Sequence, residues 1–186
     1  MLHHVTARTT LRELAATDAP FVLELLNEPS FVRGVGDRGV RTLEQAVAYI
    51  DDGPRASYDA HSYGLLLVER RSDHEPLGIC GLVRRAALDG PDLGFALLER
   101  HTGHGYANEA AAAVLAATKQ ARPPLGPILA IAAPDNVRSI RLLEALEFRF
   151  ERVVEITRGE SEVALFTWEP LAAARAGRDA ALEGEY

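Results

Sequence analysis

The residues from Asp92 to Gln120 constrain the fold of this chain most strongly. An apolar run from Leu93 to Leu98 is followed by a turn that contains Gly103 and Gly105, and then by an alanine-rich segment. The apolar residues of that last segment recur at helical spacing. The order predicts a strand, a glycine turn and a helix that begins near Gly105.

The start of this predicted helix lacks an ordinary side-chain cap. No Ser, Thr, Asp or Asn immediately precedes Tyr106, so the first N–H groups of the helix have no capping acceptor there. Gly103 and Gly105 carry no Cβ and let the backbone curve closely around a ligand. Free N–H groups at a helix start can hold a phosphate. The glycines alone are equally compatible with a plain connecting turn.

Two familiar nucleotide-binding patterns are absent from the chain. There is no Gly-x-x-x-x-Gly-Lys-Ser/Thr, and Lys119 is the only lysine. There is no Gly-x-Gly-x-x-Gly directly after the first predicted strand, which disfavours a Rossmann-type nucleotide binder. The pattern that remains is Arg100-x-x-Gly103-x-Gly105-Tyr106-Ala107.

The composition favours one compact domain in a reducing compartment. A chain of 186 residues with 47% apolar residues can bury a sizeable core. No apolar run approaches the roughly 18–20 residues that span a membrane, and the N-terminus does not open a signal peptide. A single cysteine, Cys80, excludes an internal disulfide framework and fits the cytoplasm. We read Cys80 as a buried strand residue.

Twenty basic against 27 acidic residues give a net charge of −7. This balance disfavours general nucleic-acid binding and mildly suits a cationic or amine partner.

The patterns along the chain predict an α+β fold with a mixed, mostly antiparallel sheet of about seven strands and helices on both faces, in three layers. We expect 27–41 to be a loop with a short turn at Phe31–Val32. The step from strand 92–98 to strand 127–132 should be a right-handed parallel crossover. The predicted domain is 1–170, and 171–186 is a partly ordered tail. The predicted strands are 6–14, 63–69, 77–83, 92–98, 127–132, 148–156 and 162–168, and the helices begin at Asp18, Thr42, Gly105 and Asn136.

Two sequence blocks resemble the GNAT superfamily of N-acetyltransferases. The glycine turn is similar to motif A, Gln/Arg-x-x-Gly-x-Gly/Ala, and Asn136-x-x-Ser139 followed by Leu146-x-Phe148 is similar to a later helix, Asn-x-x-Ser/Ala…Leu-Gly-Phe. The resemblance spans roughly residues 7 to 168. It is closest to the ribosomal-protein (Rim-type) subgroup, whose Gly-x-Gly-Tyr-Ala-x-Glu-Ala signature is matched by residues 103–110.

The resemblance implies a fold and a co-substrate, acetyl-CoA. In this family two adjacent parallel strands splay at the centre of the sheet, and acetyl-CoA enters the gap. The pantetheine amides would pair with exposed backbone groups, and the pyrophosphate would lie on the N–H groups of the glycine turn. Arg100 or Arg141 would add a charge-assisted contact, or belong to a solvated face. Asn136 would contact CoA in addition to capping its helix. The implied cofactor-binding residues are Ala96, Leu97, Leu98, Arg100, Thr102, Gly103, His104, Gly105, Tyr106, Ala107, Asn136 and Arg141.

The implied chemistry requires a base, because an amine is a cation at neutral pH and must lose a proton before it attacks. Asp92 is the first candidate, His101 the second and Glu99 the third. Residues of these types are also common in turns and on surfaces. His101 and His104 without a third ligand make a poor zinc site, so no metal is expected.

A proton donor for the departing thiolate is harder to assign. Leu143 stands where many family members have a tyrosine. Ser139, on the same predicted helix face, is the nearest substitute, or else a packing or capping hydroxyl. A CoA thiol is also acidic enough to leave without help.

Two residues depart from the pattern of the subgroup. Thr102 replaces its usual tryptophan and puts the substrate in doubt. Glu147 stands where the subgroup usually has glycine, at a predicted helix end. The left-handed conformation that commonly ends a helix is roughly 1 kcal/mol less favourable for glutamate, unless the chain takes another turn geometry.

The interpretation is an acetyl-CoA-dependent N-acetyltransferase that acts on a primary amine by direct attack, either a protein N-terminus or a small molecule. A non-catalytic acyl-CoA-binding module is the alternative. The acceptor surface should be built by residues 28–40, 55–62 and 157–161. We expect a cytoplasmic monomer or homodimer without nucleic-acid or membrane partners.

Overall fold

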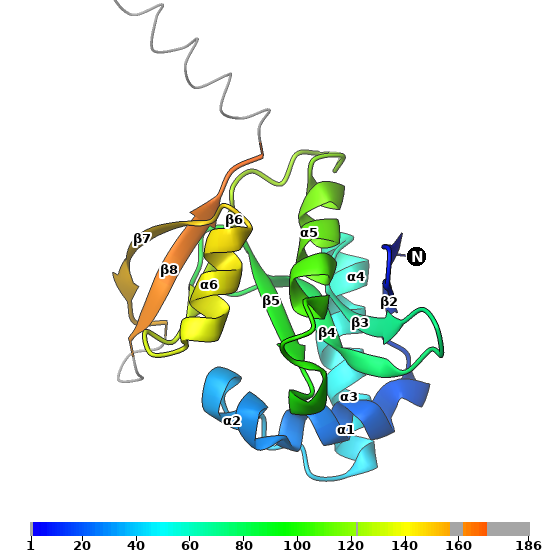
Figure 1. The fold of residues 1–186 in the computed structure, drawn as a ribbon. Helices are drawn as coiled ribbons and strands as arrows, with labels where there is room; N and C mark the ends of the chain where they lie inside the picture. The colour runs from blue at the N-terminus through cyan, green and yellow to red at the C-terminus, as the bar shows by residue number, and fades with distance from the viewer. Residues whose placement is uncertain (1, 122, 157–161, 171–186) are drawn as a thin grey trace, which may run out of the picture. The chain divides into compact units, whose positions relative to one another are not determined.

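A computed structural model describes residues 2–121, 123–156 and 162–170. They divide into two compact units: unit 1 comes from Met1–Arg84 and Leu93–Val114, and unit 2 from Arg85–Asp92 and Leu115–Tyr186. Hydrogen bonds join the described strands in the order β1-β2-β3-β4-β5-β6-β8-β7 (Figure 1). The predicted α+β fold with a mixed sheet is confirmed. The predicted tail at 171–186 and the turn at 157–160 lie outside the described residues.

The strands of unit 1 form an antiparallel sheet. Its ladders pair β1 (His3–Val5) with β2 (Thr9–Glu13), β2 with β3 (Leu65–Arg70), and β3 with β4 (Pro76–Arg84). β1 is the strand that the sequence analysis did not expect. β5 (Pro91–Leu97) follows β4 in the strand order, and within unit 1 β4 is the one described strand beside it. One edge of β5 in this unit therefore has no strand of the same unit against it.

Four α-helices of unit 1 precede β3, and the first three supply most of the apolar core of the unit. They are α1 (Ala19–Asn27), α2 (Pro29–Val35), α3 (Leu43–Ile50) and α4 (Ala56–His61); a π-helical turn, η2 (Asp51–Arg55), joins the last two. The core also takes residues from β3, β4 and the end of β5. Its buried members include Val22, Leu25, Leu26, Phe31, Ala46, Ile50, Leu67, Ile79 and Leu98.

The prediction of a loop over 27–41 was wrong for its first half, because α2 occupies 29–35. Pro29 sits at the first helical position, where its fixed φ suits a helix start. Phe31 is buried in the core of unit 1, so packing stabilises the helix. Gly36, with φ of 102°, then ends it.

Two expected helix caps differ in outcome. Thr42 caps α3 as predicted, because its side chain accepts from the Gln45 amide and the Gln45 side chain accepts from the Thr42 amide. Asp18 does not cap α1. Its carboxylate instead accepts from the Ala15 amide and from the Arg12 guanidinium, and so closes the short 3-10 turn η1 (Ala16–Asp18).

Unit 2 contains a smaller antiparallel sheet and one complete helix. β6 (Ile128–Ala132) pairs with β8 (Val163–Trp168), which pairs with β7 (Arg149–Val154). Asp92, at the start of β5, pairs with Leu129 in parallel, which confirms the predicted parallel step. The helix α6 (Val137–Ala145) precedes β7.

The turn after α6 carries the unusual glutamate. Glu147 has φ of 68°, the left-handed conformation. Its amide donates to Glu144 O at 2.9 Å, and the Phe148 amide donates to Leu143 O at 3.0 Å, which is the hydrogen-bond pattern of a Schellman motif. Leu143 and Phe148 are both buried. Glu147 thus adopts the strained geometry rather than avoiding it.

The longest described helix, α5 (Tyr106–Thr118), has 13 residues. No helix in the described part of the chain has the length and apolarity needed to cross a bilayer.

Candidate functional site

The glycine turn lies between β5 and α5, as the sequence predicts. A 3-10 turn, η3 (Glu99–His101), follows the strand, and Gly103 and Gly105 then adopt φ of 77° and 81°. Residues with a Cβ rarely adopt such angles, which explains both glycines. The first hydrogen bond of α5 runs from the Glu109 amide to Gly105 O at 3.1 Å. The helix therefore begins at Tyr106 with Gly105 in the capping position.

A run of backbone amides at this helix start is vacant. No described residue accepts a hydrogen bond from the N–H groups of Gly103, His104, Gly105, Tyr106 or Ala107. The range that the sequence analysis expected begins one residue too early. The Thr102 amide donates to Glu99 O at 3.1 Å, and the Thr102 hydroxyl donates to the same oxygen at 2.9 Å. Five consecutive donors at the positive end of a helix fit a phosphate group.

Arg8 lies beside this run of amides, although the sequence analysis did not single it out. Its Nη1 donates to His104 O at 2.9 Å, and its guanidinium lies 4.8 Å from the centre of the Tyr106 ring. Glu109 holds Arg8 in place by accepting from its backbone N and its Nε, each at 2.7 Å. Thr6 also donates its hydroxyl to Glu109, at 2.5 Å. Since Arg8 and Glu109 are 101 residues apart, no local pattern could reveal the pair.

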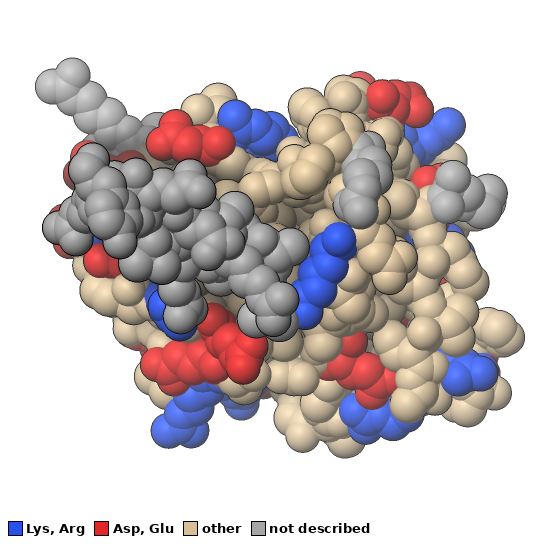
Figure 2. Space-filling view, turned by 90° about the horizontal axis from the view of Figure 1, so that it is seen from above, with Lys and Arg blue, Asp and Glu red and all other residues tan. Residues whose placement is uncertain are grey.

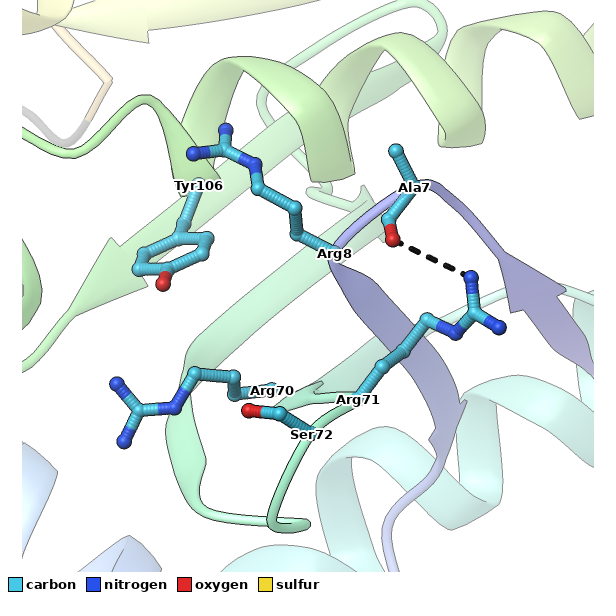
Figure 3. Close-up of a pocket in the computed structure, with 6 residues that line it drawn as sticks. All are labelled: Ala7, Arg8, Arg70, Arg71, Ser72 and Tyr106. Carbon is cyan, nitrogen blue, oxygen red and sulfur yellow. Dashed lines mark hydrogen bonds between the residues drawn. The ribbon is translucent and has the colours of Figure 1, made fainter.

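Arg8 and Tyr106 also border a pocket of about 550 Å³ in unit 1 (Figure 3). The opposite side of the pocket comes from the turn between β3 and β4. The lining residues are Ala7, Arg8, Arg70, Arg71, Ser72 and Tyr106.

His101, the second candidate base, is 7% exposed at the end of η3. Its Nε2 lies 3.1 Å from Glu75 Oε1, without hydrogen-bond alignment. Burial, followed by the charges of Arg100 and Arg70, lowers the pKa of His101 below its usual value. The imidazole is therefore neutral at neutral pH and can accept a proton.

Arg100 does not reach the vacant amides through the contacts described. Its Nη1 pairs with Glu24 of α1 at 2.6 Å, and both side chains are about half exposed, at 51% and 50%. The neighbouring Glu99 amide donates to the Glu28 carboxylate at 2.9 Å. The arrangement matches the solvated-face alternative for Arg100, so the positive charge at the turn comes from Arg8 instead.

The strand residues proposed to pair with pantetheine differ in whether their backbone N–H and C=O groups already have hydrogen-bond partners. Leu98 is fully engaged, because its amide donates to Leu77 O at 3.0 Å and its carbonyl accepts from the His101 amide at 2.9 Å. Its expected backbone pairing with a ligand is therefore wrong. Ala96 and Leu97 are half-buried members of β5, where backbone groups on the outer edge could pair with an added strand.

The remaining candidates belong to unit 2. Asp92 is fully buried, and its Oδ2 accepts from Arg85 Nε at 2.9 Å. Asn136 caps α6, with its side-chain oxygen accepting from the Ser139 amide at 3.1 Å. Ser139 is half-buried and Arg141 is exposed. The capping role predicted for Asn136 is thus confirmed.

Among the described residues, no group of three or more His, Cys, Asp or Glu side chains is arranged to hold a metal ion.

A family model described as an acetyltransferase (GNAT) domain matches residues 8–149, which is more than half of the chain. The chain therefore belongs to the GNAT acetyltransferase family.

Individual relatives agree with this family. The uncharacterized protein YkkB of Bacillus subtilis (strain 168) is 28% identical over 153 residues, which cover 81% of this chain and 87% of that protein. An acetyltransferase of Agrobacterium tumefaciens str. C58 has a TM-score of 0.77 at 24% identity, covering 91% of this chain and 95% of that one. RimL, a ribosomal L7/L12 α-N-protein acetyltransferase solved in complex with coenzyme A, has a TM-score of 0.77 at 14% identity and covers 89% and 96%.

Proposed function

We propose that this protein transfers an acetyl group from acetyl-CoA to a primary amine, on a protein N-terminus or a small molecule. The observation that carries the proposal is the run of vacant amides from Gly103 to Ala107. Such donors, aligned with the dipole of α5, offer an anionic ligand hydrogen bonds that no described residue takes. RimL, which shares the fold, was solved with coenzyme A.

The residues of unit 1 proposed to hold acetyl-CoA lie in the glycine turn and on β5. The amides of Gly103, His104, Gly105, Tyr106 and Ala107 would bind the pyrophosphate, and Ala96 and Leu97 would pair with the pantetheine amides. Arg8 supplies a positive charge beside the amides. Asn136, Arg141 and Arg100 stay expectations from the family resemblance, and Arg100 would first have to leave its ion pair with Glu24.

The transfer itself needs a proton acceptor and a proton donor. The amine nitrogen bonds to the thioester carbonyl carbon, the carbon–sulfur bond breaks, the amine proton passes to a base, and the thiolate takes up a proton. His101 is a suitable base because its lowered pKa keeps the imidazole neutral. Asp92 is the other candidate, and a water molecule would have to connect it to the amine, because its carboxylate is fully buried. Ser139 is the proposed donor.

The choice of acceptor follows the signature around α5. Residues 103–110 match the Rim-type signature, and that subgroup acts on protein N-termini. Thr102 stands where the subgroup usually has tryptophan, so a small amine remains an alternative acceptor. Residues 28–40 and 55–62 are the proposed acceptor surface in unit 1; 157–161 lie outside the described residues.

The charge balance disfavours nucleic acid as a partner, because 27 acidic residues outnumber 20 basic ones. On the face shown in Figure 2, basic and acidic side chains of the described residues lie in small groups that alternate. A nucleic-acid-binding surface would instead gather arginine and lysine into a continuous patch.

The decisive test combines binding and turnover. Calorimetry with acetyl-CoA should show saturable binding, and free-thiol release over a panel of amines and N-terminal peptides should identify the acceptor. The Gly103→Ala variant places a methyl group in open space beside the vacant amides, at φ of 77°. We expect its affinity for CoA to fall at least about tenfold, or ~1.4 kcal/mol.

A matched control separates this effect from backbone strain. Gly126 has φ of 73° and open space around its Cβ position, so Gly126→Ala carries the same strain away from the glycine turn. Its affinity for CoA should stay at the wild-type level. If acetyl-CoA releases no heat on mixing, or if both variants lose affinity equally, the proposed site is wrong.

A second function is favoured by one specific observation. Leu143, at the position where many members of the family have a tyrosine, is 1% exposed and cannot donate a proton. A module that binds acyl-CoA without turnover would need no donor and no base. Binding of acetyl-CoA with no thiol release on any amine of the panel would identify such a module.

A further inference from the structure

The pocket of unit 1 is strongly cationic on its lining. Three of its six lining residues are arginines, and none is acidic. Figure 3 shows Arg8 and Tyr106 on one side, with Arg70 and Ser72 from the β3–β4 turn on the other. The side chain of the remaining arginine, Arg71, extends away from these residues toward Ala7. A hollow with this lining suits an anion.

The three arginines differ in how far their charges are neutralised. Arg70 pairs with Asp73 at 3.0 Å and with Glu75, and Arg8 pairs with Glu109 at 2.7 Å. Arg71 contacts only neutral acceptors among the described residues: its Nη1 donates to Thr6 O at 2.7 Å and to Ala7 O at 3.2 Å. Arg71 therefore contributes a positive charge that no described carboxylate offsets.

Donors remain available at the pocket. No described residue accepts from Nη2 of Arg8, the atom that lies 3.3 Å from the position of an added Cβ on Gly105. Ser72 is exposed and carries a hydroxyl. Guanidinium and hydroxyl groups that line one pocket can bind phosphate oxygens through charge-assisted hydrogen bonds.

The pocket adjoins the vacant amides through shared residues. Arg8 donates to His104 O inside the glycine turn, and Tyr106 is both a lining residue and the first residue of α5. Two phosphate groups bound at the turn and in the pocket would therefore be neighbours. Coenzyme A carries both kinds of group in one molecule, a pyrophosphate and a 3′-phosphate monoester.

We infer that this pocket binds the 3′-phosphate of coenzyme A, through Arg8, Arg70, Arg71 and the hydroxyls of Ser72 and Tyr106. The inference rests on the proposed function, because it assigns a second phosphate of the same ligand. A phosphate monoester carries close to two negative charges at neutral pH, so it is the part of coenzyme A that gains most from an uncompensated arginine.

The test compares coenzyme A with 3′-dephospho-coenzyme A by calorimetry, so that binding is measured independently of turnover. Wild-type protein should bind coenzyme A roughly tenfold to hundredfold more tightly, the range that charge-assisted hydrogen bonds give. The preference should shrink as salt is added. It should also shrink below about pH 6, where the monoester takes up a proton.

Two variants probe the pocket without removing a buried contact. Ser72→Asp adds a negative charge on an exposed turn, and Ser72→Asn is its neutral control of the same shape. Arg71→Gln removes the uncompensated charge. Arg152→Gln, on β7 with 66% of the arginine side chain exposed, removes one positive charge elsewhere. We expect Ser72→Asp and Arg71→Gln to abolish most of the preference, and both controls to retain it.

The possible outcomes separate this inference from the proposed function. If neither ligand binds, the proposed function fails and the inference fails with it. Two results would show that coenzyme A binds without its 3′-phosphate contacting the pocket. One is equal affinity of wild-type protein for coenzyme A and 3′-dephospho-coenzyme A; the other is an unchanged preference for coenzyme A in Ser72→Asp and Arg71→Gln. Binding of inorganic phosphate to protein already saturated with coenzyme A would assign the pocket to a separate anion and overturn the inference.

Discussion

Glu109 and Arg8 are joined by two hydrogen bonds of 2.7 Å, one to the Arg8 backbone amide and one to its Nε. The carboxylate lies in the first turn of α5, where the helix dipole favours a negative charge. The pair ties the loop before β2 to the start of the helix that carries the vacant amides. The same contact thus holds the glycine turn and positions a guanidinium beside it.

We expect Glu109→Gln to lower the free energy of unfolding by about 1–2 kcal/mol, since hydrogen bonds to a charged acceptor are weakened and Arg8 is half exposed. Denaturant titration followed by circular dichroism measures the loss. Glu144→Gln, at an exposed position of α6, is the control and should change stability little. Equal losses in the two variants would show that the contact to Arg8 contributes nothing specific.

The Arg12 guanidinium should govern stability in acid. It donates to both oxygens of Asp18, at 2.8 and 2.9 Å, and to Glu69. Burial alone would raise the pKa of Asp18, but the hydrogen bonds from Arg12 and the Ala15 amide outweigh it and lower the pKa below 3.8. A carboxylate with a depressed pKa stabilises the fold above its unfolded pKa, and that contribution is lost as the pH falls through the folded value.

We therefore expect Arg12→Met to lower the free energy of unfolding by about 2–3 kcal/mol at neutral pH. The loss should be somewhat smaller than for breaking a fully buried ion pair, because a third of the Arg12 side chain is exposed. The difference from wild type should narrow as the pH falls through the lowered pKa of Asp18, since the carboxylate then becomes protonated in both proteins. Arg55→Met, which breaks an exposed pair with Asp51, should change stability by less than about 0.5 kcal/mol. If the difference in free energy of unfolding between Arg12→Met and wild type stays constant down to pH 2, this account is contradicted.

Local patterns predicted the parts of the fold that depend on local chemistry. The glycine turn, the start of α5 and the start of α3 at Thr42 all follow from residues within a few positions of one another. The helix α2 was missed because its stability comes from Phe31, whose burial against the core of unit 1 is set by the tertiary fold. Packing of this kind overrides a sequence rich in glycine and proline.

The features of the candidate site also differ in whether they depend on neighbouring residues or on distant parts of the chain. The vacant amides could be predicted because the absence of a capping residue is visible before Tyr106. Arg8 and Arg70 could not, because each reaches the start of α5 from a distant part of the chain. The engaged backbone of Leu98 was also hidden, since its partner Leu77 lies on the neighbouring strand.

The buried Cys80 and the half-buried Tyr58 should make the protein lose stability in alkali. Burial raises the pKa of the Cys80 thiol to about 12. Burial also raises the pKa of Tyr58 to about 12, where its hydroxyl donates to Leu65 O and accepts from the Leu14 amide. In the unfolded chain these groups ionise near pH 9 and 10, so the folded state loses its advantage as the pH rises from about 9 toward 12.

The thiol offers a direct measurement of this burial. At pH 8 the Cys80 thiol of the folded protein should react with a disulfide reagent far more slowly than the thiol of the urea-unfolded protein. Cys80→Ala should reduce the loss of stability between pH 9 and 10, where the tyrosine still keeps its proton. Rapid labelling of the folded protein would show that Cys80 is reachable and would contradict the assigned burial.

The left-handed residue after α6 gives the sharpest prediction for stability. Glu147→Gly should raise the free energy of unfolding by about 1 kcal/mol, because glycine adopts φ near 68° without the Cβ clash that glutamate bears. Glu144→Gly, inside the same helix, should instead lower it by about 1 kcal/mol. Glu147→Ala should match wild type, since alanine keeps the Cβ and the side chain is exposed. Denaturant midpoints of the three variants decide the matter: stabilisation by alanine as well as by glycine would point to the charge of Glu147, rather than its backbone, as the source of the strain.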